Sequence, residues 1–332
     1  MSVGPPQAEK PNKACLRKVM LTGLSLKYKY IFLRRKKNRS KNIMREIVNI
    51  LVSGTISGSL YAIMTVGLTL VYGVIRLFNF GHGLIAILGG YFTWFFLTQA
   101  GLPMPLAILV SCAIMYGLGL LLFNTTLKRL MQNPKWDMAC IFFLIGVGLV
   151  LENGILQIFG PRIKSIPRFL DGRLKWGYLR INWHDVMLIA IVIVAFFVIS
   201  YLLKKTWAGR SMQAVAQDMD GARIVGINVD KTFAWSFALG TAVTAFSGVL
   251  LASKFYMTPT VGWAWMYRGF VVVALGGLGS VGGGIIAAFI LGYTEAFITL
   301  YFSAMWVYPA WFVIFLAILL IRPQGLFGGR TN

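Results

Sequence analysis

The chain has 332 residues, of which 58% are hydrophobic and 13% are charged, and its net charge is +22. A soluble protein carries about 25% charged residues, so the composition excludes an ordinary globular enzyme. Apolar runs of span length recur along the chain. They predict an all-α, polytopic transmembrane bundle of about 8–10 membrane segments, some of them broken or re-entrant.

The distribution of the basic residues argues against nucleic-acid binding. Of the 32 lysines and arginines, 13 lie in Lys10–Arg45, and most of the others lie at span ends or in short connections. Positive charge beside apolar spans is typical of loops that face an anionic membrane surface. We therefore expect membrane lipid, and no nucleic acid, as a partner.

Residues 1–45 contain many basic residues and no long apolar run. This composition predicts a disordered cytoplasmic tail, followed by a transmembrane domain over residues 46–328. The three cysteines and two histidines show no pairing or ligand spacing, so neither a disulfide nor a metal site is expected, and no cofactor is indicated.

The first half of the transmembrane domain contains one clear interruption. The apolar run Ile47–Val74 carries Gly54 and Gly58 at a spacing that permits close helix contact. The motif RLFNFGHG then follows at residues 76–83. Further apolar runs occupy residues 84–97, 106–123 and 138–159. The polar connection Gly160–Asp185 comes next, and the parity of spans places it on the side opposite the next polar segment.

That next polar segment, residues 204–231, lies between apolar blocks at 186–203 and 232–251. Asp218 and Asp220 each suit a helix N-cap, and Gly226 suits a helix end, so we expect two short helices separated by a break. An apolar stripe recurs at helical spacing, formed by Met212, Val215, Ala216, Met219, Ala222 and Val225. The stripe is typical either of a helix on lipid headgroups or of a surface pressed against a partner protein.

The second half contains apolar runs at residues 232–253, 268–275, 285–302 and 307–321. Lys254–Met266, with Pro259 and four aromatic residues, is expected to be interfacial. The stretch GGLGSVGGG, Gly276–Gly284, includes a formal match to G-x-G-x-x-G. That fingerprint requires a soluble βαβ unit, so we reject a dinucleotide site.

Two glycine-containing breaks, Asn79–Gly83 and Gly276–Gly284, occur at corresponding places in the two halves. Paired broken segments predict a substrate site near the midplane, where freed amide groups can meet a substrate. In the alternative, the glycines only allow helices to pack closely. The candidate pathway residues are Asn79, Gly81, His82, Gly83, Gly276, Gly277, Gly279, Ser280 and Glu295.

His82 can line such a pathway or serve as a packing histidine with satisfied hydrogen bonds. Glu152 and Glu295 are the carboxylates expected within spans, where an ionisable group is costly and usually functional. The chain has no P-loop motif and no catalytic constellation. We therefore expect neither ATP hydrolysis by this polypeptide nor an enzyme.

Several motifs carry a resemblance to a known family. The pattern GR-x-x-x-AVAQD-x-x-x-A-x-x-x-GINV at Gly209–Val229 resembles the cytoplasmic coupling loop of permeases of branched-chain amino-acid ABC importers. RLFNFGHG, LGGLGS and the terminal RPQGLFG occur in that family's order. The family's usual Asp-Pro-Glu-Ala-Ala reads Asp218, Met219, Asp220, Gly221 and Ala222 here, which weakens the helix start.

The resemblance implies that residues 204–231 dock on an ATP-hydrolysing subunit. The docking residues it implies are Gly209, Arg210, Ala216, Gln217, Asp218, Ala222, Gly226, Ile227 and Asn228. It also implies a second permease subunit, two cytoplasmic ABC ATPase subunits, an extracytoplasmic substrate-binding protein and the bacterial inner membrane. Both termini are expected to be cytoplasmic, which requires one segment in each half to be re-entrant or split.

Three other functions remain open. A urea or short-amide permease of the same family shares these motifs. An ion-coupled secondary transporter also uses broken helices but needs no docking loop. An intramembrane enzyme is disfavoured because no catalytic constellation is present.

Overall fold

The computed structural model describes residues 13–176, 179–322 and 324–327, and side chains are described for residues 44–173, 181–322 and 324–327. The first part of the expected tail, residues 1–12, therefore lies outside the described residues, as do Pro323 and Gly328 of the RPQGLFG ending. The chain divides into two compact units, Met1–Asn49 and Ile50–Asn332.

The first helix, α1, extends over Lys13–Ile75, so the backbone is helical from Lys13 onward where the composition predicts disorder. Between Lys13 and Arg45 the sequence has no proline and a single glycine, Gly23, and it is rich in leucine, lysine and arginine. These residues have high helix propensity, so the helix can continue in the N-terminal direction at little cost.

Seven helices of the described part are long and apolar enough to cross a membrane, and two shorter apolar helices accompany them. Together they confirm the prediction of an all-α polytopic bundle. The long segments are α1, α3 (Met104–Leu122), α5 (Trp136–Phe159), α6 (Trp183–Lys205), α9 (Val229–Lys254), α11 (Val281–Tyr301) and α12 (Val307–Ile321), which follows the short 3₁₀ turn η2 (Ala304–Trp306). The shorter ones are α2 (His82–Thr98) and α10 (Val261–Gly276).

The remaining elements are short and lie between the spans. The π-helix η1 (Phe123–Leu127) and α4 (Lys128–Leu130) continue α3, and α7 (Trp207–Gln217) and α8 (Met219–Ile224) follow α6. Strands β1 (Arg173–Trp176) and β2 (Leu179–Asn182) pair as an antiparallel hairpin, with Arg173 opposite Asn182. This hairpin was not among the elements expected from the sequence.

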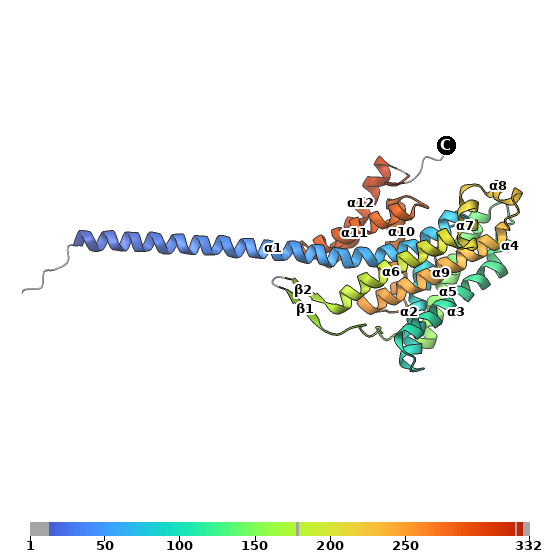
Figure 1. The fold of residues 1–332 in the computed structure, drawn as a ribbon, viewed down its shortest axis with the longest axis horizontal. Coiled ribbons are helices and arrows are strands. Elements are labelled where there is room, and N and C mark those ends of the chain that lie inside the picture. Colours follow the sequence, from blue (N-terminus) through green and yellow to red (C-terminus); the bar gives the residue numbers. More distant parts are fainter. Residues whose placement is uncertain (1–12, 177–178, 323, 328–332) are drawn as a thin grey trace, which may run out of the picture. The chain divides into compact units, whose positions relative to one another are not determined.

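The unit Ile50–Asn332 has two distinct ends. Figure 1 shows α4, α7 and α8 at one end, which we call the loop end, and β1 and β2 at the other, which we call the hairpin end. Helix α9 connects them, because Asp230 at its start pairs with Lys128 and Lys254 at its end pairs with Asp185. The connection 160–185 therefore lies opposite the polar segment 204–231, as parity predicts.

Both broken segments cross the whole unit, so of the two expected forms, re-entrant or split, they have the split one. Arg76 lines a pocket at the loop end, whereas the Trp94 ring lies under the Lys164 ammonium, 3.6 Å from its centre, at the hairpin end. In the second segment, Met257 pairs with Lys164 through backbone hydrogen bonds of 2.8 and 3.0 Å. At this contact with Trp94 and Met257, burial lowers the pKa of the Lys164 ammonium, because desolvation disfavours its charged form.

The second broken segment differs from its expected form. Helix α10 begins at Val261, so residues 261–266 are helical where Lys254–Met266 was expected to be interfacial. Gly262 and Trp265 are buried in the bundle. Of the four aromatic residues that suggested an interface, only Trp265 is buried between helices, Phe255 and Trp263 are half-buried, and Tyr256 is exposed.

The described membrane segments number nine, and an odd number of crossings puts the two ends of this unit on opposite sides. Ile75 lies at the loop end, and Thr55, earlier in α1, bonds to Tyr293 near the far end of α11. The chain therefore enters this unit, at Ile50, from the hairpin end. At the other terminus, Leu326 and Phe327 donate backbone hydrogen bonds to Leu275 and Gly276. The sides of the chain's own termini stay a prediction, because residues 1–12 and 328–332 lie outside the described residues.

Helices α1, α2, α9 and α10 form the centre of the unit. The buried share of the span is 83% in α1 and 78% in α9, but only 17% in α6 and 11% in α12, so the latter two face the surroundings. Small residues bring the central helices together. Gly58 meets Gly292 of α11, which confirms the predicted close contact at Gly54 and Gly58.

Candidate functional site

The polar segment at the loop end forms two short helices joined at Asp218, as its sequence predicts. The Thr206 hydroxyl caps α7 by accepting from the Gly209 N–H at 3.1 Å. The Asp218 carboxylate caps α8 by accepting from the N–H groups of Asp220 and Gly221 at 3.1 and 3.0 Å. Of the two candidate N-caps, Asp218 is therefore the one that caps, and Asp220 lies in the first turn of α8.

The residues after α8 make a tight return into α9. Gly226 adopts a φ of +84°. Its N–H donates to the Arg223 carbonyl at 3.0 Å, and the Ile227 N–H donates to the Ala222 carbonyl at 2.9 Å. This pattern is a Schellman motif, which glycine favours. The Asn228 side chain then caps α9 by accepting from the Lys231 N–H at 3.0 Å. The residues Gly226, Ile227 and Asn228 thus have a local structural role.

Gly209 allows α6 and α7 to meet at a sharp corner. A Cβ atom at this position would lie 2.3 Å from the Leu202 carbonyl oxygen. The Arg210 guanidinium donates to the Lys205 carbonyl at 3.3 Å, across the same corner. These two residues of the GR pattern therefore set the direction in which the loop leaves the membrane segment.

Half of the loop's apolar stripe packs on the protein's own core: Met212, Val215 and Ala222 are buried, whereas Met219 and Val225 are exposed. Val215 and Ala222 are 3% and 4% exposed and pack in one cluster with Val229, Phe233 and Phe237. Two short helices cannot stand alone in water, so their apolar face must be buried at once. The buried half of the stripe is thus used within the chain, and docking of the exposed half on a partner stays a prediction.

A different edge of the loop is available to a partner. Ile224 and Val225 are 86% and 75% exposed, and Trp207 is 71% exposed. Gln217 and Asp218 are exposed beside them. Exposed apolar side chains next to each other, as Ile224 and Val225 are in the sequence, are typical of a contact surface.

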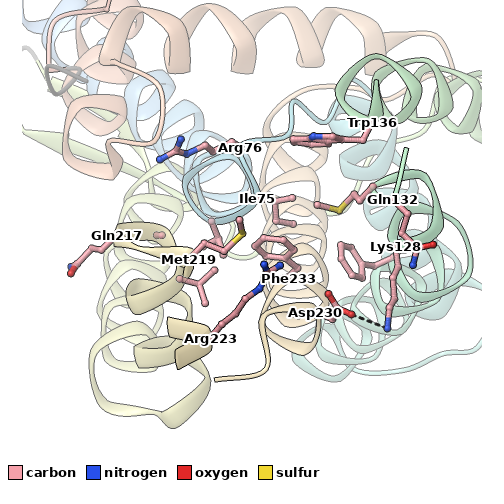
Figure 2. Close-up of a pocket in the computed structure, with 15 residues that line it drawn as sticks. Ile75, Arg76, Lys128, Gln132, Trp136, Gln217, Met219, Arg223, Asp230 and Phe233 are labelled. Atoms are coloured by element: carbon pink, nitrogen blue, oxygen red, sulfur yellow. Dashed lines mark ion pairs between the residues drawn. The ribbon is translucent and has the colours of Figure 1, made fainter. Parts of the chain in front are cut away.

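A pocket of about 500 Å³ lies beneath the loop and is shown in Figure 2. Residues of α1, α4, α5, α7, α8 and α9 line it, including Ala216 and Gln217. Lys128 points across it toward Asp230, with a nitrogen–oxygen distance of 3.0 Å. Arg76, also on its wall, has a φ of +58°, a conformation found at no other non-glycine position of the described residues. The pocket thus joins the loop to the start of the first broken segment.

The first break packs inside the protein with its polar groups engaged. The Met64 carbonyl accepts from His82 Nε2 at 3.1 Å, and His82 Nδ1 bonds the Thr244 hydroxyl at 3.0 Å. The Asn79 side chain accepts from the Gly81 N–H at 3.0 Å. Asn79 and His82 are 3% and 1% exposed. This arrangement of His82 is that of a packing histidine with satisfied hydrogen bonds.

The starts of α2 and α10 meet at Gly83 and Gly262. A Cβ atom on Gly83 would lie 2.0 Å from the Gly262 carbonyl oxygen. The two broken segments therefore cross in opposite directions and begin their helices side by side. The second break is Lys254–Thr260, which leads from the hairpin end to this contact. Pro259 and Gly262 were the sequence signal for it, but the aromatic residues around them suggested an interface.

The glycine-rich stretch Gly276–Gly284 lies away from the contact between Gly83 and Gly262. Gly277 and Gly279 have φ values of +102° and +82°, and the Ser280 hydroxyl caps α11 by accepting from the Gly283 N–H at 3.1 Å. Gly279 approaches Gly73 of α1. The structure therefore does not bring this stretch together with Asn79–Gly83. It forms a tight turn between α10 and α11.

The two span carboxylates both have partners. Glu152 accepts from the Trp263 Nε1–H at 2.7 Å. Glu295 accepts from the Tyr61 hydroxyl at 2.5 Å, and the same hydroxyl oxygen accepts from Arg268 at 2.9 Å. Glu295 was among the residues expected from the sequence, whereas Arg268 was not. The sequence did contain a signal for Arg268, because it is a lone cation in an otherwise apolar stretch.

The N-cap of α8 gives a direct test of the loop. Asp218→Ala removes the acceptor of two N–H groups and should destabilise α8 by about 1 kcal/mol. Hydrogen exchange at the Asp220 and Gly221 amides is then expected to be about fivefold faster. Asp220→Ala is the matched control, because its side chain caps nothing and pairs only with exposed Arg223 at 3.8 Å. Equal effects of the two substitutions would contradict the capping role.

These features define a multi-pass membrane protein with two oppositely directed broken spans and a structured two-helix loop at one end. A family model described as "Branched-chain amino acid transport system / permease component" matches residues 50–322. The chain belongs to this family of transport permeases, as the motifs suggested.

Curated relatives agree with the family. BraD of Pseudomonas aeruginosa, a high-affinity branched-chain amino acid transport system permease protein, is 26% identical over 84% of this chain and 94% of its own length. LivH of Salmonella typhimurium, which carries the same description, is 29% identical over 83% of this chain and 94% of its own length. LsrC of Escherichia coli O9:H4, an autoinducer 2 import system permease protein, is 30% identical over 75% of this chain and 69% of its own length. Among solved structures, PsaBC from Streptococcus pneumoniae in complex with Fab covers 86% of this chain and 93% of its own, with 14% identity and a TM-score of 0.40.

Proposed function

We propose that this chain is the membrane-spanning subunit of an ABC importer that moves branched-chain amino acids into the cytoplasm. The family match over residues 50–322 carries this proposal. The matched relatives BraD and LivH are described as branched-chain amino acid permeases and align over nearly their whole length. No P-loop occurs in the sequence, so the energy must come from separate ATPase subunits.

The loop end is the proposed cytoplasmic side in the bacterial inner membrane. There the exposed edge around Ile224 and Val225 would contact one of two ATPase subunits. The hairpin end would then be extracytoplasmic, where the basic connection 160–182 can meet a substrate-binding protein. A second permease subunit would complete the assembly by covering part of the exposed apolar surface.

The substrate pathway is proposed to involve Glu295 and its neighbours more than the glycine breaks. Asn79, Gly81, His82 and Gly83 are engaged in packing around α2, and Gly276, Gly277, Gly279 and Ser280 form the α10–α11 turn. These positions would support the pathway by fixing the helices that border it. Glu295, in contrast, is a half-buried carboxylate between spans.

A second candidate is the import of another small solute by the same ABC mechanism. The LsrC relative supports it, because that permease is described as part of an autoinducer 2 import system. A urea or short-amide substrate belongs to the same alternative.

The test is uptake by the reconstituted importer. The chain would be co-expressed with its ATPase subunits and substrate-binding protein and placed in proteoliposomes. We expect uptake of radiolabelled leucine that requires both ATP and binding protein and is blocked by excess isoleucine but not by urea. Uptake of urea or autoinducer 2 instead of leucine would support the second candidate. Uptake driven by an ion gradient without ATP would contradict an ABC importer.

A further inference from the structure

A polar cluster lies among four helices, α1, α10, α11 and α12. Tyr61 of α1 is central: its hydroxyl donates to Glu295 of α11 at 2.5 Å and accepts from Arg268 of α10 at 2.9 Å. Trp311 of α12 closes the cluster, with its ring centre 5.3 Å from that of Tyr61. The cluster therefore contains one cation, one carboxylate and an aromatic wall.

The donors of this cluster outnumber its acceptors. Arg268 Nε and Trp311 Nε1 are buried, and neither donates to an acceptor in the described residues. Trp311 is fully buried, and the Arg268 guanidinium carbon lies 6.0 Å from the centre of its ring. Buried donors in folded proteins almost always have partners. Two such donors beside one another point to an acceptor group that is not part of this chain.

Arg268 is placed among aromatic faces as well. Its guanidinium carbon lies 5.6 Å from the Tyr61 ring centre and 5.3 Å from that of Tyr308. A charged group within a span costs several kcal/mol unless it is paired, and it is typically functional. A purely structural contact among these helices could be made with apolar residues at lower cost. The charge of Arg268 and that of Glu295 therefore require a further explanation.

The chemistry of the cluster matches the backbone groups of an amino acid. A guanidinium binds a carboxylate through two parallel hydrogen bonds, and an indole N–H can add a third. A carboxylate and aromatic faces both attract an ammonium group. We propose that Arg268 and Trp311 bind the α-carboxylate, and Glu295 the α-ammonium, of an amino acid as it passes through the membrane.

This inference rests on the proposed function and adds the residues that select the substrate class. A zwitterion replaces the Arg268–Tyr61–Glu295 contacts with equivalent charged contacts, so both charges stay paired. A neutral solute such as urea cannot do so and leaves both charges unpaired. The cluster thus favours zwitterionic amino acids over uncharged solutes.

The experiment measures equilibrium binding to the purified permease–ATPase complex in nanodiscs, without the binding protein. The probes are L-leucine, leucinamide, which lacks the carboxylate, and 4-methyl-2-oxopentanoate, which lacks the ammonium group. The wild type is expected to bind leucine at least tenfold more tightly than either analogue. Glu295→Gln should remove the preference over the keto acid, and Arg268→Gln should remove the preference over leucinamide.

Two further variants keep the test decisive. Arg268→Gln combined with Glu295→Gln leaves no unpaired charge, so it should fold and should bind all three probes with similar weak affinity. Glu152→Gln is the matched control, because it neutralises the other span carboxylate, which pairs with Trp263. It should keep the wild-type order of affinities.

Each outcome supports or overturns the proposal. Variants that lower the unfolding temperature but keep the wild-type order of affinities would assign the cluster a structural role alone, and so would the absence of leucine binding to the wild type. Leucine uptake by the wild-type importer remains a separate measurement. If that uptake is present while the selectivity pattern is absent, the inference fails and the proposed function stands.

Discussion

Replacing Gly83 with alanine is expected to abolish transport, whereas Gly117→Ala should leave it close to the wild-type level. A Cβ atom at Gly83 would lie 2.0 Å from the Gly262 carbonyl oxygen and 2.4 Å from the Met266 backbone nitrogen. Both neighbours are backbone atoms of α10, so a side-chain rotation cannot relieve the contact. Overpacking of this kind costs about 1–3 kcal/mol or more and pushes the starts of α2 and α10 apart. A Cβ atom at Gly117 would meet nothing within 4 Å.

Uptake, membrane abundance and thermal stability must be measured together on these two variants. A role limited to packing predicts that uptake falls in proportion to abundance or stability. A role at the substrate pathway predicts a stable, abundant protein that does not transport, with the affinity of the binding protein unchanged. Wild-type uptake by a Gly83→Ala protein that is correctly inserted would contradict the close contact itself.

The second large effect is expected at the exposed edge of the two-helix loop. Ile224→Asp places a charge on a side chain that is 86% exposed, so the fold should be unaffected. If this edge contacts an ATPase subunit, the charge would be desolvated at the interface, and transport should fall at least tenfold with loss of ATPase co-purification. Normal uptake and normal co-purification would show that the contact lies elsewhere.

The matched comparison is Ala222→Asp on the opposite face of α8. Ala222 is 4% exposed and packs in the same cluster as Val229 and Phe233. An aspartate there would bury an unpaired charge within the chain's own core, which destabilises the loop itself. We therefore expect Ala222→Asp to reduce the amount of folded protein, whereas Ile224→Asp should reduce coupling alone. This contrast separates docking from folding.

Much of the local structure could be predicted from residue order. The break between α7 and α8, the end of α8 at Gly226 and the helical spans all follow from contacts among residues close in sequence. An Asp N-cap or a glycine in the left-handed region needs only its own turn of chain. The orientation of the loop's apolar stripe did not follow, because Val215 can bury equally well against a partner or against Phe233.

The sequence by itself determined that this chain is a polytopic helical membrane protein with a structured polar loop. Apolar length and capping patterns are local properties, and a bilayer leaves the backbone few alternatives to a helix. Only the tertiary structure decided that both broken segments cross, because a break exposes the same amides whether the chain turns back or continues. The contacts of Arg268 with Tyr61 and of Tyr61 with Glu295 likewise join residues far apart in sequence. Which helices become neighbours depends on how their small residues pack, and no local pattern records that choice.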